Sequence, residues 1–288
     1  MVYLVRFLVL AVAAIVVGTA HIARAEEIPA AAVQISTPAY APLEGDFEPA
    51  LGAYEYDVSW QGIPAATVNV EITQDGPRYR IVAAAETASA IDLFYRLRYR
   101  AEGIISALDL LPVRTIIDQR ENSRHKNTRI SFLESGEIES VRWKSGKDTE
   151  VIRFNPNNFT LDPFSAAFLA RSLPWEAGQV REFDTFNGKT RYLISLTAHE
   201  KIRMTVNGTP RDVWVISPRV RNLTNPEKTG KLREAKIYVT ADSSREILQI
   251  VSEVFIGSVT TKLASFAPAR VLPPVQVAQR QRVAFKFF

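Results

Sequence analysis

The sequence predicts a mainly β protein: one large curved antiparallel sheet or open β-barrel, with one short helix packed on the concave face. Two observations carry this prediction. Most of the chain alternates apolar and polar residues in short runs that end at Gly, Pro or Asn, which is typical of antiparallel strands. One stretch, residues 162–173, is instead apolar on nearly all sides, and a helix of that kind is normally buried.

Residues 1–25 have the features of a secretory signal peptide. Arg6 supplies a positive charge, an apolar stretch follows at 7–20, and Ala23–Ala25 fits the small-x-small cleavage pattern. We expect cleavage after Ala25 and a periplasmic location. The alternative is that this segment is retained as an N-terminal anchor. Residues 26–52 are rich in Ala and Pro without a regular period, and we expect a disordered leader there.

The folded domain is expected to span residues 53–266, and its first half is typical of a meander of short strands. Residues 54–60 begin it, with Tyr, Val and Trp alternating with Glu, Asp and Ser. Residues 89–94 predict a single helical turn. The remaining strands of this half are predicted at 68–73, 79–85, 95–100, 111–117, 124–132, 138–143 and 151–154.

The helix begins at Asp162, whose carboxylate can accept a hydrogen bond from a free N–H of the first turn. Pro163 then occupies the first helical position, where its missing N–H costs nothing. Phe164 and Phe168 share one face by their spacing, together with Ala167. A membrane-active helix is the alternative, but the apolar run is far shorter than the ~20 residues that a membrane span needs.

Strands resume after the helix, and Asn-Gly pairs at 187–188 and 207–208 predict two hairpins. The polar stretch 219–233 predicts a long exposed loop, and residues 267–288 predict a Pro-rich, basic tail. The strands of this half are predicted at 180–186, 190–197, 201–206, 211–217, 235–240, 246–255 and 258–266.

Composition excludes several chemistries. The chain has no cysteine, so it has no thiol nucleophile, disulfide or cysteine-type metal site. His125 and His199 have no second histidine at metal-ligand spacing, and the sequence holds neither G-x-S-x-G nor a phosphate-binding or dinucleotide fingerprint. We therefore expect no metal and no cofactor. The formal charge of +4 is small and dispersed, which does not indicate a nucleic-acid partner.

One strand carries three arginines on one face. Arg96, Arg98 and Arg100 alternate with apolar residues, so a strand places their guanidinium groups together. One interpretation is an anion site for phosphate or carboxylate, which match the guanidinium fork. The other is a solvated strand face whose arginines pair with acidic residues of a neighbouring strand.

Four segments in this order resemble the DUF3108 family of exported bacterial proteins: 54–66, Leu111-Pro112, 162–174 and 238–245. The resemblance spans roughly residues 53–266, with departures at Ala65-Ala66, where the family more often has glycine, and at 239–240, where tryptophan is common. It implies an envelope location and a β-rich fold, and it supplies no reaction. The chain matches the family pattern at Asp162, Ser165 and Arg171, which we interpret as helix-capping and local hydrogen-bonding groups rather than catalysts.

The leading hypothesis is a non-enzymatic envelope protein that binds an amphipathic lipid or a glycan in the concavity, whose wall is lined by aromatic residues and leucine. The second is a protein-interaction module whose interior is filled by Phe164 and Phe168, with the loop 219–233 and the tails as contact elements. A hydrolase is the third, and it would need a polar cleft with converging carboxylates. A membrane barrel is a weaker alternative, suggested by the terminal Phe288 alone. No integral span is expected after signal cleavage.

Overall fold

The structure is a computed structural model that describes residues 35–42, 47–206, 208–227, 234–254 and 257–269. The predicted signal peptide, its cleavage site and most of the predicted C-terminal tail lie outside these residues. The first meander contains β1 (Gly52–Trp60), β2 (Ile63–Asp75), β3 (Arg78–Thr87), α2 (Ser89–Asp92), β4 (Leu97–Ser106), β5 (Pro112–Glu121), β6 (Arg124–Phe132), β7 (Ile138–Lys144) and β8 (Glu150–Phe154). The rest comprises β9 (Thr160–Leu161), α3 (Pro163–Ser172), β10 (Val180–Phe186), β11 (Arg191–Val206), β12 (Thr209–Asn222), β13 (Glu234–Thr240), β14 (Ile247–Glu253) and β15 (Ser258–Pro268).

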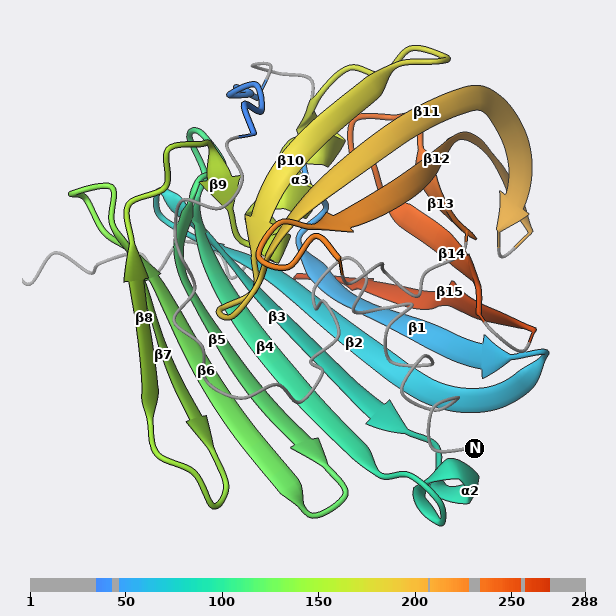
Figure 1. Ribbon diagram of the computed structural model, residues 1–288. Coiled ribbons are helices and arrows are strands. Elements are labelled where there is room, and N and C mark those ends of the chain that lie inside the picture. Colours follow the sequence, from blue (N-terminus) through green and yellow to red (C-terminus); the bar gives the residue numbers. More distant parts are fainter. Residues whose placement is uncertain (1–34, 43–46, 207, 228–233, 255–256, 270–288) are drawn as a thin grey trace, which may run out of the picture.

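All fifteen strands form one sheet, in the order β8-β7-β6-β5-β4-β3-β2-β1-β15-β14-β13-β12-β11-β10-β9 (Figure 1). Each strand pairs with its sequence neighbour on the way out to an edge, and β1 pairs with β15 in the middle of the sheet, with Gly52 opposite Pro268. Neighbours are antiparallel except β9 and β10, which are parallel. The prediction of one large, open antiparallel sheet with a helix on its concave face is confirmed.

Each predicted strand is present, although β2 and β4 extend several residues beyond their predicted bounds, and three further differences follow. The two strands expected at 190–197 and 201–206 form the single strand β11, whose pairing with β12 is irregular between Ala198 and Lys201. The first four residues of the predicted loop 219–233 extend β12, because β11 supplies their backbone partners up to Asn222. The two-residue strand β9 was not predicted, since a segment that short has no period.

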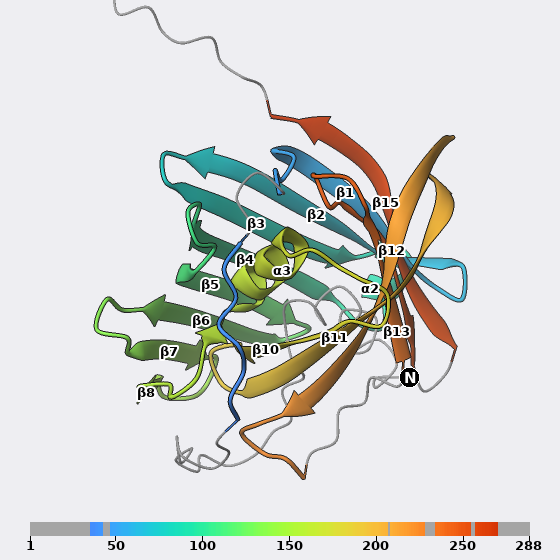
Figure 2. The ribbon, with the colours of Figure 1, turned by 90° about the horizontal axis from the view of Figure 1, so that it is seen from above.

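The two edges of the sheet stay unpaired, but side chains bring them close. The rings of Phe154 on β8 and Phe186 on β10 meet edge-to-face with centroids 5.1 Å apart. The Ser140 hydroxyl on β7 donates to the carbonyl of Gly188 in the β10–β11 turn at 2.7 Å. The sheet therefore curves almost into a barrel around α3 (Figure 2) without closing its hydrogen-bond ladder.

The described part of the predicted leader differs from the expectation of disorder. The Tyr40 hydroxyl accepts a hydrogen bond from the backbone N–H of Glu182 at 3.0 Å, and the Tyr40 ring lies 5.0 Å from that of Phe183. Phe47 packs edge-on against Phe168 of α3. Residues 35–42 and 47–51 thus run alongside the helix (Figure 2, blue) as an extended segment, held by aromatic anchors in an otherwise Pro/Ala-rich sequence.

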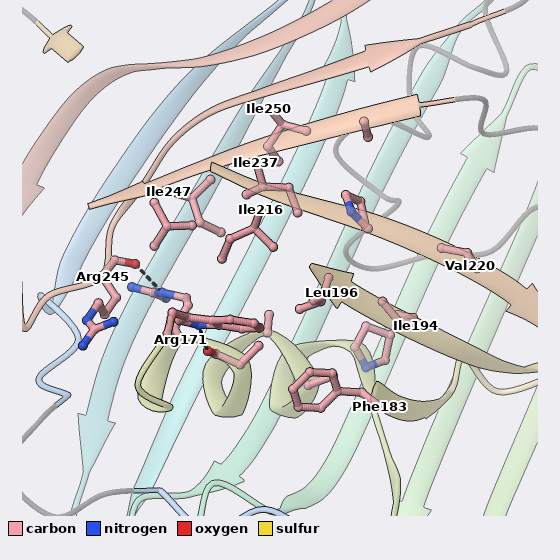
Figure 3. Close-up of a pocket in the computed structure, with 18 of the residues that line it drawn as sticks. Arg171, Phe183, Ile194, Leu196, Ile216, Val220, Ile237, Arg245, Ile247 and Ile250 are labelled. Carbon is pink, nitrogen blue, oxygen red and sulfur yellow. Dashed lines mark hydrogen bonds between the residues drawn. The ribbon is translucent and has the colours of Figure 1, made fainter. Parts of the chain in front are cut away.

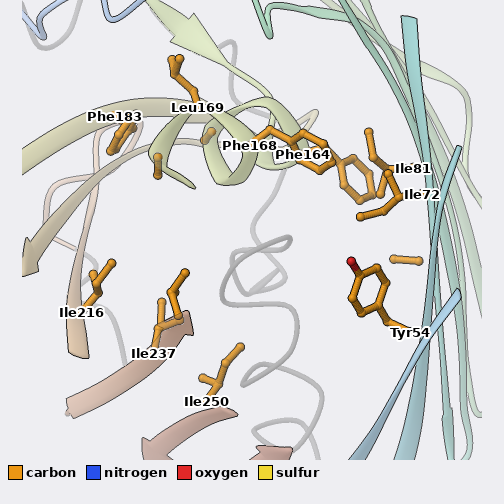
Figure 4. Packing of buried hydrophobic residues seen from close by; sticks show 14 of the residues in the cluster. Tyr54, Ile72, Ile81, Phe164, Phe168, Leu169, Phe183, Ile216, Ile237 and Ile250 are labelled. Atoms are coloured by element: carbon orange, nitrogen blue, oxygen red, sulfur yellow. The ribbon is translucent and has the colours of Figure 1, made fainter. Parts of the chain in front are cut away.

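Helix α3 is fixed by its cap and by its phenylalanine face. Asp162 accepts from the backbone N–H of Ser165 at 2.7 Å, and Pro163 occupies the first turn, as predicted. Phe164 lies directly on the Cα of Gly103 in β4. Figure 4 shows Phe164 directed toward Ile72 and Ile81 on one wall of the sheet.

Candidate ligand-binding cavity

Helix α3 divides the concave interior into a filled half and an open half. Phe164 and Phe168 fill the side toward β2–β4, where Phe168 also meets Tyr79 with ring centroids 5.8 Å apart. The opposite side of the helix carries small residues, Ala166, Ala167 and Ala170, which line a cavity. Ala167, which the spacing grouped with the phenylalanines, therefore belongs to the cavity side.

The cavity lies between α3 and the inner face of β10–β14 (Figure 3). The cavity is partly open to solvent. Side chains two residues apart on a strand point to the same face of a sheet, which is how Ile194 and Leu196 of β11 both reach it. The larger apolar side chains of the wall are Phe183, Ile194, Leu196, Ile216, Ile237 and Ile250.

Arg171 brings a positive charge to one end of this apolar cavity. Its Nε donates to the carbonyl of Arg245 at 2.7 Å, and its Nη2 donates to the carbonyl of Ser244 at 2.9 Å. The guanidinium also lies 5.2 Å from the ring centroid of Phe47 and 5.3 Å from that of Phe168. These partners, 73 and 74 residues away in sequence, replace the local hydrogen bonds that the sequence predicted.

The half-buried Arg171 has no acidic counterpart within ion-pair distance among the described residues. Burial lowers the pKa of the guanidinium, while Tyr54, Tyr56 and Glu246 act in the opposite direction. Burial likewise raises the pKa of Tyr54 to about 12, so that its hydroxyl stays neutral. Glu246 is engaged elsewhere, since it accepts from Arg211 at 3.1 Å. Arg171 therefore brings to this end of the cavity a guanidinium that is held by backbone carbonyls and is not directly paired with a carboxylate.

Arg245 stands at the same end of the cavity in an uncommon backbone conformation. Its φ is +46°, which lies in the left-handed region that residues other than glycine rarely adopt. This conformation follows a turn in which the N–H of Arg245 donates to the carbonyl of Asp242. Figure 3 shows the Arg245 carbonyl turned toward the guanidinium of Arg171. The turn thus presents the oxygen that holds Arg171 in place.

The three predicted strand arginines lie away from this cavity. Arg98 and Arg100 alternate along β4 with Leu97 and Tyr99, which are buried in the core, so these arginines are on the outer face, and the exposed Arg96 immediately precedes the strand. Arg98 donates to Asp92 at 2.5 Å and lies 3.6 Å from Glu86. Among the described residues, Arg96 and Arg100 form no ion pair. They line a polar depression of the outer surface together with residues of β2, β3 and β5.

The other conspicuous polar residues act within the fold. Asp162 is fully buried and accepts hydrogen bonds from the Thr115 hydroxyl of β5 and from the N–H of Ser165. Burial raises the pKa of its carboxyl, and these hydrogen bonds oppose the rise. His125 contacts Asp118 at 2.6 Å and His199 contacts Ser217 at 2.9 Å. The described residues contain no cluster of metal-ligating side chains.

Fold and cavity together define a class of barrel-like β proteins whose single sheet wraps around one buried helix. A family model described as "Protein of unknown function (DUF3108)" matches residues 55–264, and the chain belongs to this family. The resemblance stated from the sequence is thereby confirmed.

A solved structure shows the same kind of fold. The chain is similar to a β-barrel-like protein of the domain of unknown function DUF1849 from Brucella abortus, with a TM-score of 0.53 and 9% identity over 76% of this chain and 98% of that one. A candidate exported protein with a YmcC-like fold from Bacteroides fragilis gives a TM-score of 0.34 at 8% identity, covering 79% of this chain and 100% of that one. A candidate lipoprotein from Parabacteroides distasonis gives a TM-score of 0.32 at 9% identity, covering 77% of this chain and 98% of that one. No match was found among curated proteins. In the part of the chain that is described, the helices are too short to span a bilayer.

Proposed function

We propose that this protein is a non-enzymatic, periplasmic envelope protein that binds an amphipathic lipid with an anionic head group. The apolar part would occupy the cavity between α3 and β10–β14, and the head group would lie at Arg171. The observation that supports this is the pairing of an aliphatic cavity with a guanidinium that has no carboxylate partner among the described residues. The periplasmic location rests on the secretory features of residues 1–25.

The chemistry of the wall favours a lipid over a glycan. Glycans need many hydrogen-bonding side chains, whereas this wall is apolar apart from Arg171, Arg245, Ser252 and the indole N–H of Trp175. The Trp175 indole N–H already donates to the carbonyl of Ala170 at 2.9 Å. Each buried methylene of a ligand contributes about 0.8 kcal/mol, so an apolar wall of this kind favours an alkyl chain over a sugar.

Arg171 would supply selectivity for the head group. Two of its N–H groups are used by backbone carbonyls, which fix the side chain and leave other N–H groups of the fork for a ligand. A carboxylate or phosphate at this position would form charge-assisted hydrogen bonds, and these are about twice as strong as neutral ones. The low polarity of the surrounding wall strengthens such an interaction further.

Native mass spectrometry of protein purified under mild conditions is the first test, followed by binding of hexadecanoate and of hexadecanol as matched probes. Ala170→Leu places extra volume in the cavity and should weaken both probes, whereas Ala53→Leu, at an exposed position of β1, should change neither. Arg171→Gln should weaken hexadecanoate about tenfold or more and leave hexadecanol nearly unchanged. Absence of any bound mass, together with absence of binding of either probe, would refute the proposal.

A second candidate, an interaction module of the envelope, is favoured by the filled half of the interior. Phe164 and Phe168 are 5% and 3% exposed, so this side of the helix leaves no room for a ligand. In that case Ala170→Leu would leave function intact because the cavity would be incidental. The loop proposed as a contact element would now comprise only residues after Asn222, since the preceding residues belong to β12. A partner captured by the wild-type chain and lost on deletion of residues 223–227 would support this candidate.

A further inference from the structure

Two large apolar side chains project from one rim of the sheet. Leu93 is 81% exposed and Phe94 is 65% exposed, and they directly follow the helical turn α2. Figure 1 shows α2 protruding beyond the ends of β3 and β4. Ile63, 55% exposed, belongs to the neighbouring hairpin, and the N–H of Ala88 donates to the carbonyl of Ala65 to join that hairpin to α2. Adjacent exposed residues of this size are unusual on a surface that meets only water.

Arginines lie next to this apolar tip, on the side of β4 and the β5–β6 hairpin. Arg96 follows Phe94 by two residues, and its backbone exchanges two hydrogen bonds of 2.8 Å with Asn122 in the β5–β6 hairpin. That hairpin places the exposed Arg124 at the same rim, and Arg100 continues the outer face of β4. Among the described residues, none of these three arginines forms an ion pair.

The tip and the outer face are held as one unit. Arg98 donates to both carboxylate oxygens of Asp92, at 3.1 Å from Nη1 to Oδ1 and 2.5 Å from Nη2 to Oδ2. The Thr87 hydroxyl at the end of β3 donates to the same carboxylate. Arg98 thereby compensates the charge of the Asp92 carboxylate. The turn that carries Leu93 and Phe94 is fixed relative to β4 and its neighbouring arginines.

We propose that this rim is a docking surface for an anionic lipid bilayer. Leu93 and Phe94 enter the boundary between head groups and acyl chains, and Arg96, Arg100 and Arg124 contact lipid phosphates. The occupant follows from charge complementarity: arginines without an ion-pair partner among the described residues lie next to an exposed apolar pair, and anionic bilayers offer phosphates directly above an apolar interior. The proposal concerns a different face from the cavity and stands independently of what the cavity binds.

The test uses flotation with vesicles of phosphatidylglycerol and phosphatidylcholine against vesicles of phosphatidylcholine alone. Protein is taken from the soluble extract of expressing cells, and its intact mass is recorded so that a retained N-terminal segment is recognised. We expect binding to the anionic vesicles, weakened about tenfold by the pair Leu93→Ser and Phe94→Ser. Arg96→Gln and Arg100→Gln should each weaken it about fivefold.

Leu108→Ser is the matched control, because Leu108 is 84% exposed and lies in the β4–β5 turn at the opposite end of β4. It should leave binding unchanged. Equal flotation with neutral vesicles, equal losses with Leu108→Ser, or no flotation at all would each overturn the proposal. An independent readout is Phe94→Trp, whose indole emission should be quenched by brominated lipids in anionic vesicles, while Leu108→Trp is not. Quenching of both, or of neither, would also contradict it.

Discussion

Replacing Gly103 with alanine tests whether the contact between β4 and α3 sets the position of the helix. A Cβ at this residue would lie 2.4 Å from Cδ2 of Phe164 and 2.9 Å from its Cγ. These separations are far below van der Waals contact, and Phe164 is buried, so either the ring or the helix must move. Overpacking of this kind destabilises the folded state by about 1–3 kcal/mol. Alanine also restricts the unfolded chain more than glycine does, which stabilises the folded state by about 0.5–1 kcal/mol. We therefore expect a net loss of about 1–2 kcal/mol in the free energy of unfolding.

A double-mutant cycle with Phe164→Leu isolates the contact. The smaller side chain makes room for the new methyl, so Gly103→Ala should cost close to nothing in that background, and the coupling should exceed about 1 kcal/mol. Equilibrium urea unfolding, followed by tryptophan fluorescence and by far-UV circular dichroism, measures each corner of the cycle. Additive effects would refute the reasoning, because they would mean that Phe164 does not rest on the backbone of β4. Because the cavity lies on the other side of α3, Gly103→Ala should also weaken hexadecanoate binding, and Phe164→Leu should restore it.

Three further predictions address the cap, the acid response and the N-terminal segment. Asp162→Ala should lower the unfolding free energy by about 1–3 kcal/mol, since it leaves buried donors unsatisfied. Asp162→Asn is the control, because it keeps an acceptor for the N–H of Ser165. Equal melting temperatures for the two variants would contradict the capping role. Burial raises the pKa of Asp242, but hydrogen bonds from Ser244, Arg211 and Thr240 outweigh this effect and lower the pKa from 3.8 to about 2. The stability that the Asp242 carboxylate contributes is therefore present above about pH 4 and lost as the pH falls toward 2. Because its side chain is 47% exposed, we expect only about 1 kcal/mol after solvent screening, and Asp242→Asn should flatten this part of the acid unfolding curve. Tyr40→Ala should make the N-terminal segment sensitive to limited proteolysis while the sheet resists, and an unchanged digestion pattern would show that Tyr40 does not anchor the segment.

Most of the sheet could be predicted because strand alternation and hairpin turns are local properties. The Asn187-Gly188 turn and the strand 180–186 are examples in which sequence and structure coincide. Pairing between β1 and β15 could not be predicted in this way, since its partners lie about 200 residues apart, as Trp60 and Val259 do. The polar start of the predicted loop 219–233 was misassigned because backbone pairing with β11 outweighs composition.

The site was less accessible to sequence reasoning than the fold. Helical spacing identified Phe164 and Phe168 as a packing face, and the alanines of the other face contained the only indication of a cavity. The partners of Arg171 are carbonyls of a turn at 244–245, and no pattern marks a carbonyl as an acceptor for a distant guanidinium. Tyr40 and Phe47 pack against β10 and α3, but the surrounding proline and alanine residues give their segment the composition of a disordered leader.

The central pairing of β1 with β15 has a consequence for how the chain folds. The two meanders can each grow from local hairpins, but the seam between them closes a loop of about 200 residues and leaves two strand edges unprotected until it forms. A circular permutant that joins residue 268 to residue 52 through a short linker, and opens the chain between β8 and β9, would visit the strands in the order in which they lie in the sheet. Such a chain should fold faster and aggregate less during refolding than the natural connectivity, although the strand pairings of its finished sheet are the same.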